Sequence, residues 1–245
     1  MSIRHAIILA AGHGSRLLPL TVGMPKCLIE VGGKTILSHQ LDALLSVGVE
    51  RFTIVTGYRA GQIEREAYHL ARGGMKIETL FNPFWAAASS IGSVWIARER
   101  LRQPFLLLNG DTIFDPALLH GALDGCGPGI SLLVEAVGTP EEDDMRVVVS
   151  GGVVRRVAKG LPLHEARHRS LGVIASNSRD GSVYLTALDQ ELRSGTGVQS
   201  FHHAVIDEIA RTESVCAAEV GDGFWQEIDR PEDIDRWNDL HRKPD

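Results

Sequence analysis

The most constraining feature of the chain is its opening segment, in which the apolar run Ile7-Ile8-Leu9-Ala10-Ala11 leads directly into the turn Gly12-His13-Gly14. Such a run is typical of a buried strand, and the turn would stand at its carboxyl end. Glycines in a turn of this kind let backbone N–H groups approach a nucleotide closely. The segment therefore predicts a strand followed by a nucleotide-binding turn.

Two cations follow this turn, Arg16 and Lys26, ten residues apart. Together they can neutralise the charge of a nucleoside triphosphate and of the pyrophosphate that it releases. By itself, a strand followed by Gly-x-Gly is more often an ordinary tight turn. The dinucleotide fingerprint would also need a third glycine where this chain has Leu17, and the Walker motif is absent. With the pair Pro25-Lys26, however, the segment indicates chemistry on nucleotide phosphates.

The rest of the first half predicts a parallel sheet covered by helices on both faces, that is, a Rossmann-like, doubly wound α/β fold. Apolar runs rich in Val, Ile and Leu alternate there with segments of helical period. The expected strands are residues 4–10, 52–56, 76–81 and 104–109, and the expected helices are residues 34–47, 59–71 and 90–101.

The second half changes character and predicts a small antiparallel extension on the acceptor side of the site. Gly151-Gly152 is a hairpin signal between two valine-rich runs. The expected strands are residues 130–135, 145–149, 153–158, 170–176, 215–220 and 224–228, and the expected helices are residues 178–194, 200–212 and 230–241. With no fixed-period repeat, we expect one domain over 1–245, with nucleotide bound by 1–125 and the acceptor by 126–245.

Composition narrows the class of protein. The formal net charge is -6, and no run of Lys or Arg resembles a nucleic-acid footprint, so a polyanion must be met by local cations. The N-terminal apolar run is too short for a signal sequence, and no stretch approaches the length of a membrane span. Cys27, Cys126 and Cys216 lack metal-ligand or paired spacing and favour a reducing compartment. We expect a cytoplasmic protein that binds neither nucleic acid nor membranes.

Two carboxylates stand where a metal would be needed for chemistry at a phosphate. Asp111 follows an apolar run at the carboxyl end of an expected strand, where open α/β sheets place their ligands. Asp229 follows the expected strand 224–228 and precedes Pro231. The alternatives are a turn-forming, helix-capping role for Asp111 and an N-cap for Asp229. The acidic run 141–144 is denser, but we expect it to lie in a solvated loop.

These segments together resemble the small bacterial nucleotidyltransferases, most closely the cytidylyltransferases that act on phosphocholine, inositol 1-phosphate or phosphonoalkyl amines. The resemblance rests on residues 7–28, on Asn109-Gly110-Asp111 and on residues 225–233, and it spans nearly the whole chain. It implies a magnesium-dependent reaction of CTP with a small phosphorylated alcohol or phosphonate that releases pyrophosphate. The alternatives are a sugar-1-phosphate nucleotidylyltransferase that uses UTP, dTTP or GTP, and a non-catalytic scaffold of the same fold.

The resemblance also implies roles for individual residues. Lys26 and Arg16 would stabilise the reacting phosphates, and Asp111 and Asp229 would hold Mg²⁺. The residues expected to bind nucleotide are Leu9, Ala10, Ala11, Gly12, His13, Gly14, Ser15, Arg16, Asn82, Ser89, Ser90 and Gly110. The residues expected to bind the acceptor are Trp85, Lys159, Arg169, Gly172 and Trp225. Because a scaffold has no need of all four catalytic residues, their presence favours an enzyme, and residues 82–92 could form a lid or a homodimer contact.

The expected acceptor hairpin departs from the family pattern at Arg169, where related proteins often carry an acidic residue. An acceptor with an ammonium head would need a carboxylate or an aromatic cage, so Arg169 favours an acceptor without a compact cation. The opposing evidence is a set of aromatic residues that could supply a cage. They are Phe84, Trp85, Trp95 and Trp225, of which Trp95 is at helical spacing and more typical of a core residue. The histidines show no metal-ligand spacing.

Overall fold

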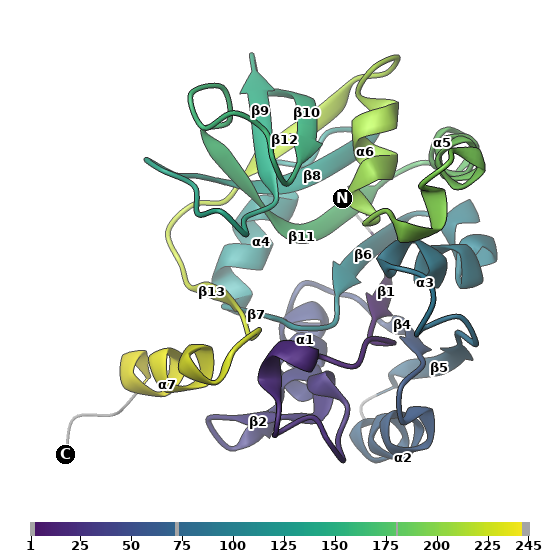
Figure 1. Cartoon of the computed structure of the whole chain (residues 1–245), viewed down its shortest axis with the longest axis vertical. Helices are drawn as coiled ribbons and strands as arrows, with labels where there is room; N and C mark the ends of the chain where they lie inside the picture. Colours follow the sequence, from purple (N-terminus) through teal and green to yellow (C-terminus); the bar gives the residue numbers. More distant parts are fainter. Residues whose placement is uncertain (1–2, 72–73, 180, 242–245) are drawn as a thin grey trace.

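The computed structural model describes residues 3–71, 74–179 and 181–241, which build a nine-stranded mixed sheet (Figure 1). The strand order is β5-β4-β1-β6-β11-β8-β12-β10-β9. The strands of this sheet are β1 (His5–Leu9), β4 (Arg51–Thr56), β5 (Lys76–Phe81), β6 (Phe105–Asn109), β8 (Ile130–Ala136), β9 (Arg146–Ser150), β10 (Val153–Ala158), β11 (His168–Ser176) and β12 (Val215–Glu219).

The four strands β5, β4, β1 and β6 are parallel and form the predicted Rossmann-like half. Neighbouring residues of β1 face opposite sides of the sheet, since Ile8 packs in one buried cluster and Ile7 in another. The helices that cover this sheet are α1 (Ile36–Ser46), α2 (Ala60–Leu70), α3 (Ser90–Ile96), α4 (Pro116–Asp124), α5 (Ser182–Arg193) and α6 (His203–Ile209). The doubly wound prediction is therefore confirmed.

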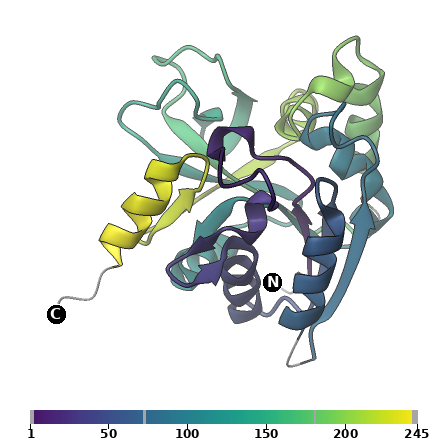
Figure 2. The same ribbon diagram turned by 60° about the horizontal axis from the view of Figure 1, so that its bottom comes forward.

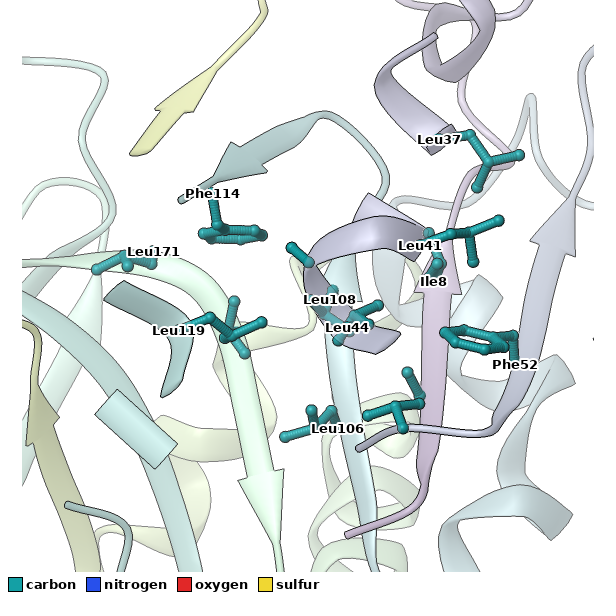
Figure 3. Packing of buried hydrophobic residues seen from close by; sticks show 14 of the residues in the cluster. Ile8, Leu37, Leu41, Leu44, Phe52, Leu106, Leu108, Phe114, Leu119 and Leu171 are labelled. Atoms are coloured by element: carbon teal, nitrogen blue, oxygen red, sulfur yellow. The ribbon is translucent and has the colours of Figure 1, made fainter. Parts of the chain in front are cut away.

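Helices α1, α2 and α4 cover the face that carries Ile8, and α3, α5 and α6 cover the face that carries Ile7. Figure 3 shows the first face, where Leu41 and Leu44 of α1 lie over the central strands. Phe52 of β4 packs in the same cluster, and all of these side chains are at most 2% exposed. Burial on this scale holds the carboxyl ends of β1 and β6 rigidly side by side.

The antiparallel strands continue the same sheet and do not form a separate layer. Strand β11 runs antiparallel to both β6 and β8, and the β9–β10 hairpin lies at the far edge. Its turn is at Gly151-Gly152, as the sequence predicts, with both glycines at positive φ. Strands of the second half of the chain are thereby attached directly to the central strand β6, next to the glycine turn that follows β1.

Several elements differ from the sequence prediction. The helix predicted over 90–101 is α3 followed by a short 3-10 helix (Arg98–Arg102), and the helix predicted over 200–212 is only α6. Part of the helix predicted over 178–194 falls at residue 180, outside the described residues, and α5 begins at Ser182. The elements that were not predicted are α4, β7 (Thr112–Phe114), the hairpin β2 (Glu30–Val31) and β3 (Lys34–Thr35), and the 3-10 helices Ser15–Leu17, Lys26–Leu28 and Gly197–Gln199.

The last helix, α7 (Pro231–Leu240), stands apart from the sheet and packs near the N-terminal turn (Figure 2). Strand β13 (Trp225–Glu227) leads into it and pairs with β7 in a two-stranded sheet of their own. Ile234 and Trp237 of α7 then pack against a small buried cluster that includes Leu17 and Val31. This packing brings Asp229 back beside the first strand.

All three cysteines are free thiols, and burial raises the pKa of the Cys27 thiol to about 12. A membrane-crossing helix would need more length and more apolar residues than any helix in the described ranges has.

Candidate active site

The carboxyl ends of β1 and β6 open into a cavity of about 280 Å³. One wall comes from β1 and the turn after it, and the other from the β8–β9 loop, the end of β10 and the start of α6. A second cavity of about 260 Å³ lies over the glycine turn and shares part of this wall. Segments from both halves of the chain thus enclose one site.

Lys26 lies at the centre of the site. Its Nζ donates to Asp111 Oδ2 at 2.7 Å and also to Asp229 Oδ1. Gly14 makes room for this lysine, because a Cβ at Gly14 would lie 2.9 Å from the Cβ of Lys26, and its φ of +69° suits glycine. Burial opposes the charge on Lys26, but Asp111 and Asp229 outweigh burial and raise the pKa of the ammonium group.

Arg16 extends the same charge network toward the acceptor side. Its guanidinium contacts Asp229 Oδ2 at 2.6 Å and forms a second ion pair with Asp143. Asp143 also pairs with Lys159, so one carboxylate joins a cation of the N-terminal turn to one that follows β10. The two cations lie within reach of a single polyanion, which could replace Asp143 as their partner.

Glu227 is a site residue that sequence analysis missed. It lines the cavity between Asp111 and Asp229 and accepts a hydrogen bond from the Asn109 amide at 3.4 Å. Burial, together with the negative charges of Asp111 and Asp229, raises the pKa of Glu227 to about 8. Its position two residues before Asp229, at the end of the expected strand 224–228, was the available signal.

The carboxylates around Lys26 fit a divalent cation. Asp111 Oδ2 and Asp229 Oδ1 converge on one point, and carboxylate oxygens are the ligands that Mg²⁺ prefers. Glu227 adds a third carboxyl group beside them, whose pKa is raised by burial and by the charges of Asp111 and Asp229. Lys26 stands between these groups, and no cluster of three or more His, Cys, Asp or Glu residues in the described ranges is already arranged as a complete metal site.

Most of the predicted nucleotide-binding residues line the two cavities. They are Leu9, Ala10, Ala11, Gly12, Gly14, Ser15, Arg16, Ser89, Ser90 and Gly110. The structure does not bring His13 and Asn82 to the cavity walls. The His13 ring packs on Tyr58 with ring centroids 4.4 Å apart. Asn82 is 1% exposed and holds the following loop, because its amide donates to Ser93 and accepts from the backbone of Phe84.

The predicted acceptor residues fall in different places. Lys159 and Trp85 line the first cavity, whereas Arg169 and Trp225 line an adjoining cavity of about 700 Å³. Gly172 lines none of the cavities described here, and its backbone N–H donates to Ser170 Oγ at 3.0 Å.

The charge of Arg169, in strand β11, is neutralised by its neighbours. The surroundings of Arg169 are therefore less cationic than the sequence suggests. Its guanidinium donates to Glu135 at 2.7 Å, contacts Asp144 at 3.5 Å and lies 4.6 Å from the centroid of the Trp225 ring. Trp225 therefore has a cation over its face already, supplied by the chain itself.

One expectation about this region is confirmed and another is wrong. The acidic run lies in an exposed loop, as expected, although Asp143 and Asp144 also pair with arginine or lysine. Trp95 is not a core residue, since it is 37% exposed with Arg98 stacked on its ring. In both cases the partner comes from tertiary or helical contacts that composition does not report.

The structure also brings two adjacent histidines to the cavity wall, His202 and His203. Both are buried, at 1% and 4% exposure, and their ring centroids are 4.2 Å apart. Neither was predicted, because a His-His pair without metal-ligand spacing gives no sequence signal for a pocket.

A family model described as a MobA-like NTP transferase domain matches residues 6–171. A curated relative, CMP-5'-(3-aminopropyl)phosphonate synthase of Streptomyces rubellomurinus, is 31% identical over 236 residues, which cover 93% of this chain and 37% of that protein. Mannose-1-phosphate guanylyltransferase catalytic subunit beta of Drosophila melanogaster is 27% identical, over 94% of this chain and 60% of its own length. The chain thus spans less than two thirds of either relative.

Among solved structures, an inositol-1-phosphate CTP transferase from T. maritima superimposes with a TM-score of 0.79 at 21% identity. The match covers 97% of each chain. At this level of identity the likeness establishes the fold alone.

Proposed function

The chain belongs to the family of MobA-like NTP transferase domains, and from that premise we propose that it transfers a nucleotidyl group, most specifically CMP from CTP, to a small phosphorylated alcohol or phosphonate. The observation that carries the proposal is the contact of Lys26 with both Asp111 and Asp229 at the end of β1. The products are a CDP-linked or CMP-linked compound and pyrophosphate. We infer that one domain performs this reaction in the cytoplasm.

The proposed reaction is an in-line displacement at the α-phosphorus. An oxygen of the acceptor phosphate or phosphonate forms a bond to the α-phosphorus while the bond to the β-phosphate bridging oxygen breaks. The acceptor is already an anion at neutral pH, so no general base is needed, and catalysis reduces to positioning and charge stabilisation. Lys26 would stabilise charge on the α-phosphate and on the leaving pyrophosphate, and Arg16 would hold the triphosphate.

Asp111 and Asp229, with Glu227 beside them, would hold the Mg²⁺ ion, and members of this family generally use a divalent metal. When bound, Mg²⁺ would make the α-phosphate more electrophilic and neutralise charge as pyrophosphate forms. Lys159 would meet the acceptor phosphate from the opposite wall. For these groups to meet substrate, Asp143 must give up Arg16 and Lys159 to phosphate oxygens.

A sugar-1-phosphate nucleotidylyltransferase is the second candidate, favoured by the guanylyltransferase relative. CTP is preferred because a relative that is 31% identical over 93% of this chain is a CMP-5'-(3-aminopropyl)phosphonate synthase. Both candidates use the same Lys26–carboxylate centre, so they differ in base and acceptor pockets and not in mechanism.

The test is pyrophosphate release with Mg²⁺, in which CTP, UTP, GTP, dTTP and ATP are crossed with non-sugar acceptors and hexose 1-phosphates. We expect activity with CTP and a non-sugar acceptor. Lys26→Ala should lower turnover by roughly 10²-fold or more, the scale of losing one preorganised electrostatic contact. Lys34→Ala is the matched control, because Lys34 is an exposed lysine paired with Asp42 outside the site.

Preference for UTP, dTTP or GTP with a hexose 1-phosphate would replace the cytidylyltransferase proposal by the second candidate. Nucleotide binding without turnover in any combination would instead indicate a scaffold. Near-normal turnover of the Lys26→Ala variant would remove Lys26 from the mechanism.

A further inference from the structure

The carboxylate of Asp143 lies where the two substrate phosphates of the proposed reaction would come together. Its two oxygens have different partners, since Oδ2 contacts the guanidinium of Arg16 and Oδ1 contacts the ammonium group of Lys159. Arg16 is the cation proposed for the triphosphate, and Lys159 is the cation proposed for the acceptor. Asp143 therefore occupies both cations at once, at the wall of the cavity that both substrates would enter.

Neither cation depends on Asp143 alone for its place in the cavity. Arg16 also contacts Asp229 Oδ2 at 2.6 Å, and the ammonium group of Lys159 lies 5.2 Å from the centroid of the Phe201 ring. Each cation thus keeps a second partner when Asp143 leaves. The contacts of Asp143 therefore compete with substrate phosphates for these cations and are not needed to hold the cations at the cavity wall.

Asp143 is a charged competitor that can withdraw into water. Its hydrogen bond with Lys159 and the positive charges of Lys159 and Arg16 lower the pKa of Asp143, so the group is an anion at neutral pH. The side chain is half-exposed and belongs to the loop 137–145 between β8 and β9. Water can therefore solvate the carboxylate as soon as a phosphate displaces it.

The two contacts of Asp143 are expected to be lost together. The oxygens of a carboxylate are held rigidly on one carbon atom, so a phosphate oxygen that replaces Oδ2 on Arg16 would lie close to Oδ1. Two anions at such short range repel each other, and the carboxylate then moves away from Lys159 as well. In the same way, an acceptor phosphate that took Lys159 would release Arg16. Either substrate thus frees the cation of the other.

We propose that Asp143 couples the two substrates of this chain, so that binding of the nucleotide raises the affinity for the acceptor and binding of the acceptor raises the affinity for the nucleotide. The first ligand to bind must displace the carboxylate, whereas the second finds its cation already free. By thermodynamic linkage the two effects are equal in size. This inference rests on the proposed function, to which it adds a linkage between the two subsites.

The test measures the affinity for a nucleotide with and without acceptor. The nucleotide is α,β-methylene-CTP with Mg²⁺, whose carbon bridge is not cleaved, and the acceptor is the compound that supports the fastest pyrophosphate release in the test of the proposed function. Isothermal titration calorimetry gives the dissociation constant of the nucleotide. Because the ion pairs of Asp143 are partly exposed, we expect a coupling at the lower end of the usual range, so that saturating acceptor lowers this constant by about 5-fold or more.

Asp143→Asn and Asp143→Ala remove the charge that holds both cations. In each variant the nucleotide alone should bind about 5-fold or more tightly than in the wild type, because no carboxylate has to be displaced. Saturating acceptor should then no longer lower the dissociation constant of the nucleotide. Loss of a merely structural contact would have the opposite effect on the nucleotide alone, since a disturbed site binds more weakly.

Glu142→Gln is the matched control for the loss of one negative charge from this loop. Glu142 is exposed and forms no ion pair with any residue that the structure describes. The variant should keep the nucleotide affinity and the coupling of the wild type.

Three results would overturn the inference while the nucleotidyltransferase proposal stands. They are a wild-type nucleotide affinity that acceptor does not raise, a coupling that persists unchanged in both Asp143 variants, and an equal gain of nucleotide affinity in Glu142→Gln. Absence of pyrophosphate release with every nucleotide and acceptor overturns the proposed function itself, and the inference with it.

Discussion

At the scale of single residues, Glu227 predicts a pH dependence of stability. Its pKa is raised from the usual value to about 8 in the folded protein by burial and by Asp111 and Asp229. The folded state therefore binds more protons than the unfolded state between about pH 4.5 and about pH 8. It follows that the free energy of unfolding falls as pH rises through this window, because the buried carboxyl must ionise.

Glu227→Gln removes this effect, and the variant should gain stability over the wild type as pH rises from 5 to 8. The measurement is chemical denaturation of both proteins across this range without divalent cation. The buried histidines have lowered pKa values, which make stability decrease as pH falls below about 6.5. Their contribution is the same in both proteins, so it cancels when the free energy of unfolding of the wild type is subtracted from that of the variant at each pH. Parallel pH profiles for the two proteins would contradict the assignment of this titration to Glu227.

At this scale the sequence could indicate which residues would lie together where each of them follows a motif along the chain, whereas their roles stay a prediction. Lys26, Asp111 and Asp229 each end or follow an apolar strand or glycine turn, and the structure brings all three into contact. Asp143 and His203 instead meet partners contributed by other segments, namely Arg16 and Ser170. No local pattern encodes such a partner, because it is chosen by the tertiary fold.

At the scale of elements, the packing of α7 on the β2–β3 hairpin positions the second metal-binding candidate. The carboxylate of Asp233, in the first turn of α7, accepts the backbone N–H groups of Asp229 and Arg230, both at 2.8 Å. Trp237, further along α7, packs over Gly32 in the hairpin turn. The place of Asp229 thus depends on a helix that begins only after it.

This packing predicts different costs for alanine at two adjacent glycines. A Cβ at Gly32 would lie 2.1 Å from Trp237 Cζ3, whereas a Cβ at Gly33 would meet nothing within 4 Å. Both have positive φ, so both substitutions should cost about 1 kcal/mol in backbone strain. Gly32→Ala should cost a further ~1–3 kcal/mol because the indole must move.

Thermal unfolding of the two variants measures the difference. Titration of Mg²⁺ in the presence of CTP should also show weaker metal binding by Gly32→Ala than by Gly33→Ala. Equal melting temperatures would mean that α7 accommodates the methyl group freely and does not constrain Asp229.

Elements with long apolar runs, such as β1, β4 and β6, were predicted within a residue or two, since burial on both faces makes a parallel strand almost continuously apolar. The three-residue strand β7 is too short to show a period. The run at β13 was predicted as a strand, but its pairing with β7 outside the main sheet was not, because strand partners depend on long-range contacts.

At the scale of the whole molecule, the site joins segments from both ends of the chain through ion pairs. Asp143 links the N-terminal turn to the end of β10, and Asp229 links that turn to the segment before α7. In the proposed complex, phosphate oxygens and a divalent cation would replace several of these internal pairs while keeping the same segments together. Binding should therefore stabilise the fold as a whole and not only the loops that touch the nucleotide.

The expected stabilisation is measurable. A ligand present at 100 times its dissociation constant adds about 2.7 kcal/mol, which raises the melting temperature of a protein of this size by roughly 5–10 °C. We expect the full increase only with CTP and Mg²⁺ together, and a small one with CTP in EDTA, since the triphosphate would then face Asp111 and Asp229 without a cation between them. An equal shift in EDTA would contradict the proposed metal role of these two carboxylates, because nucleotide affinity would then be independent of the ion they are expected to hold.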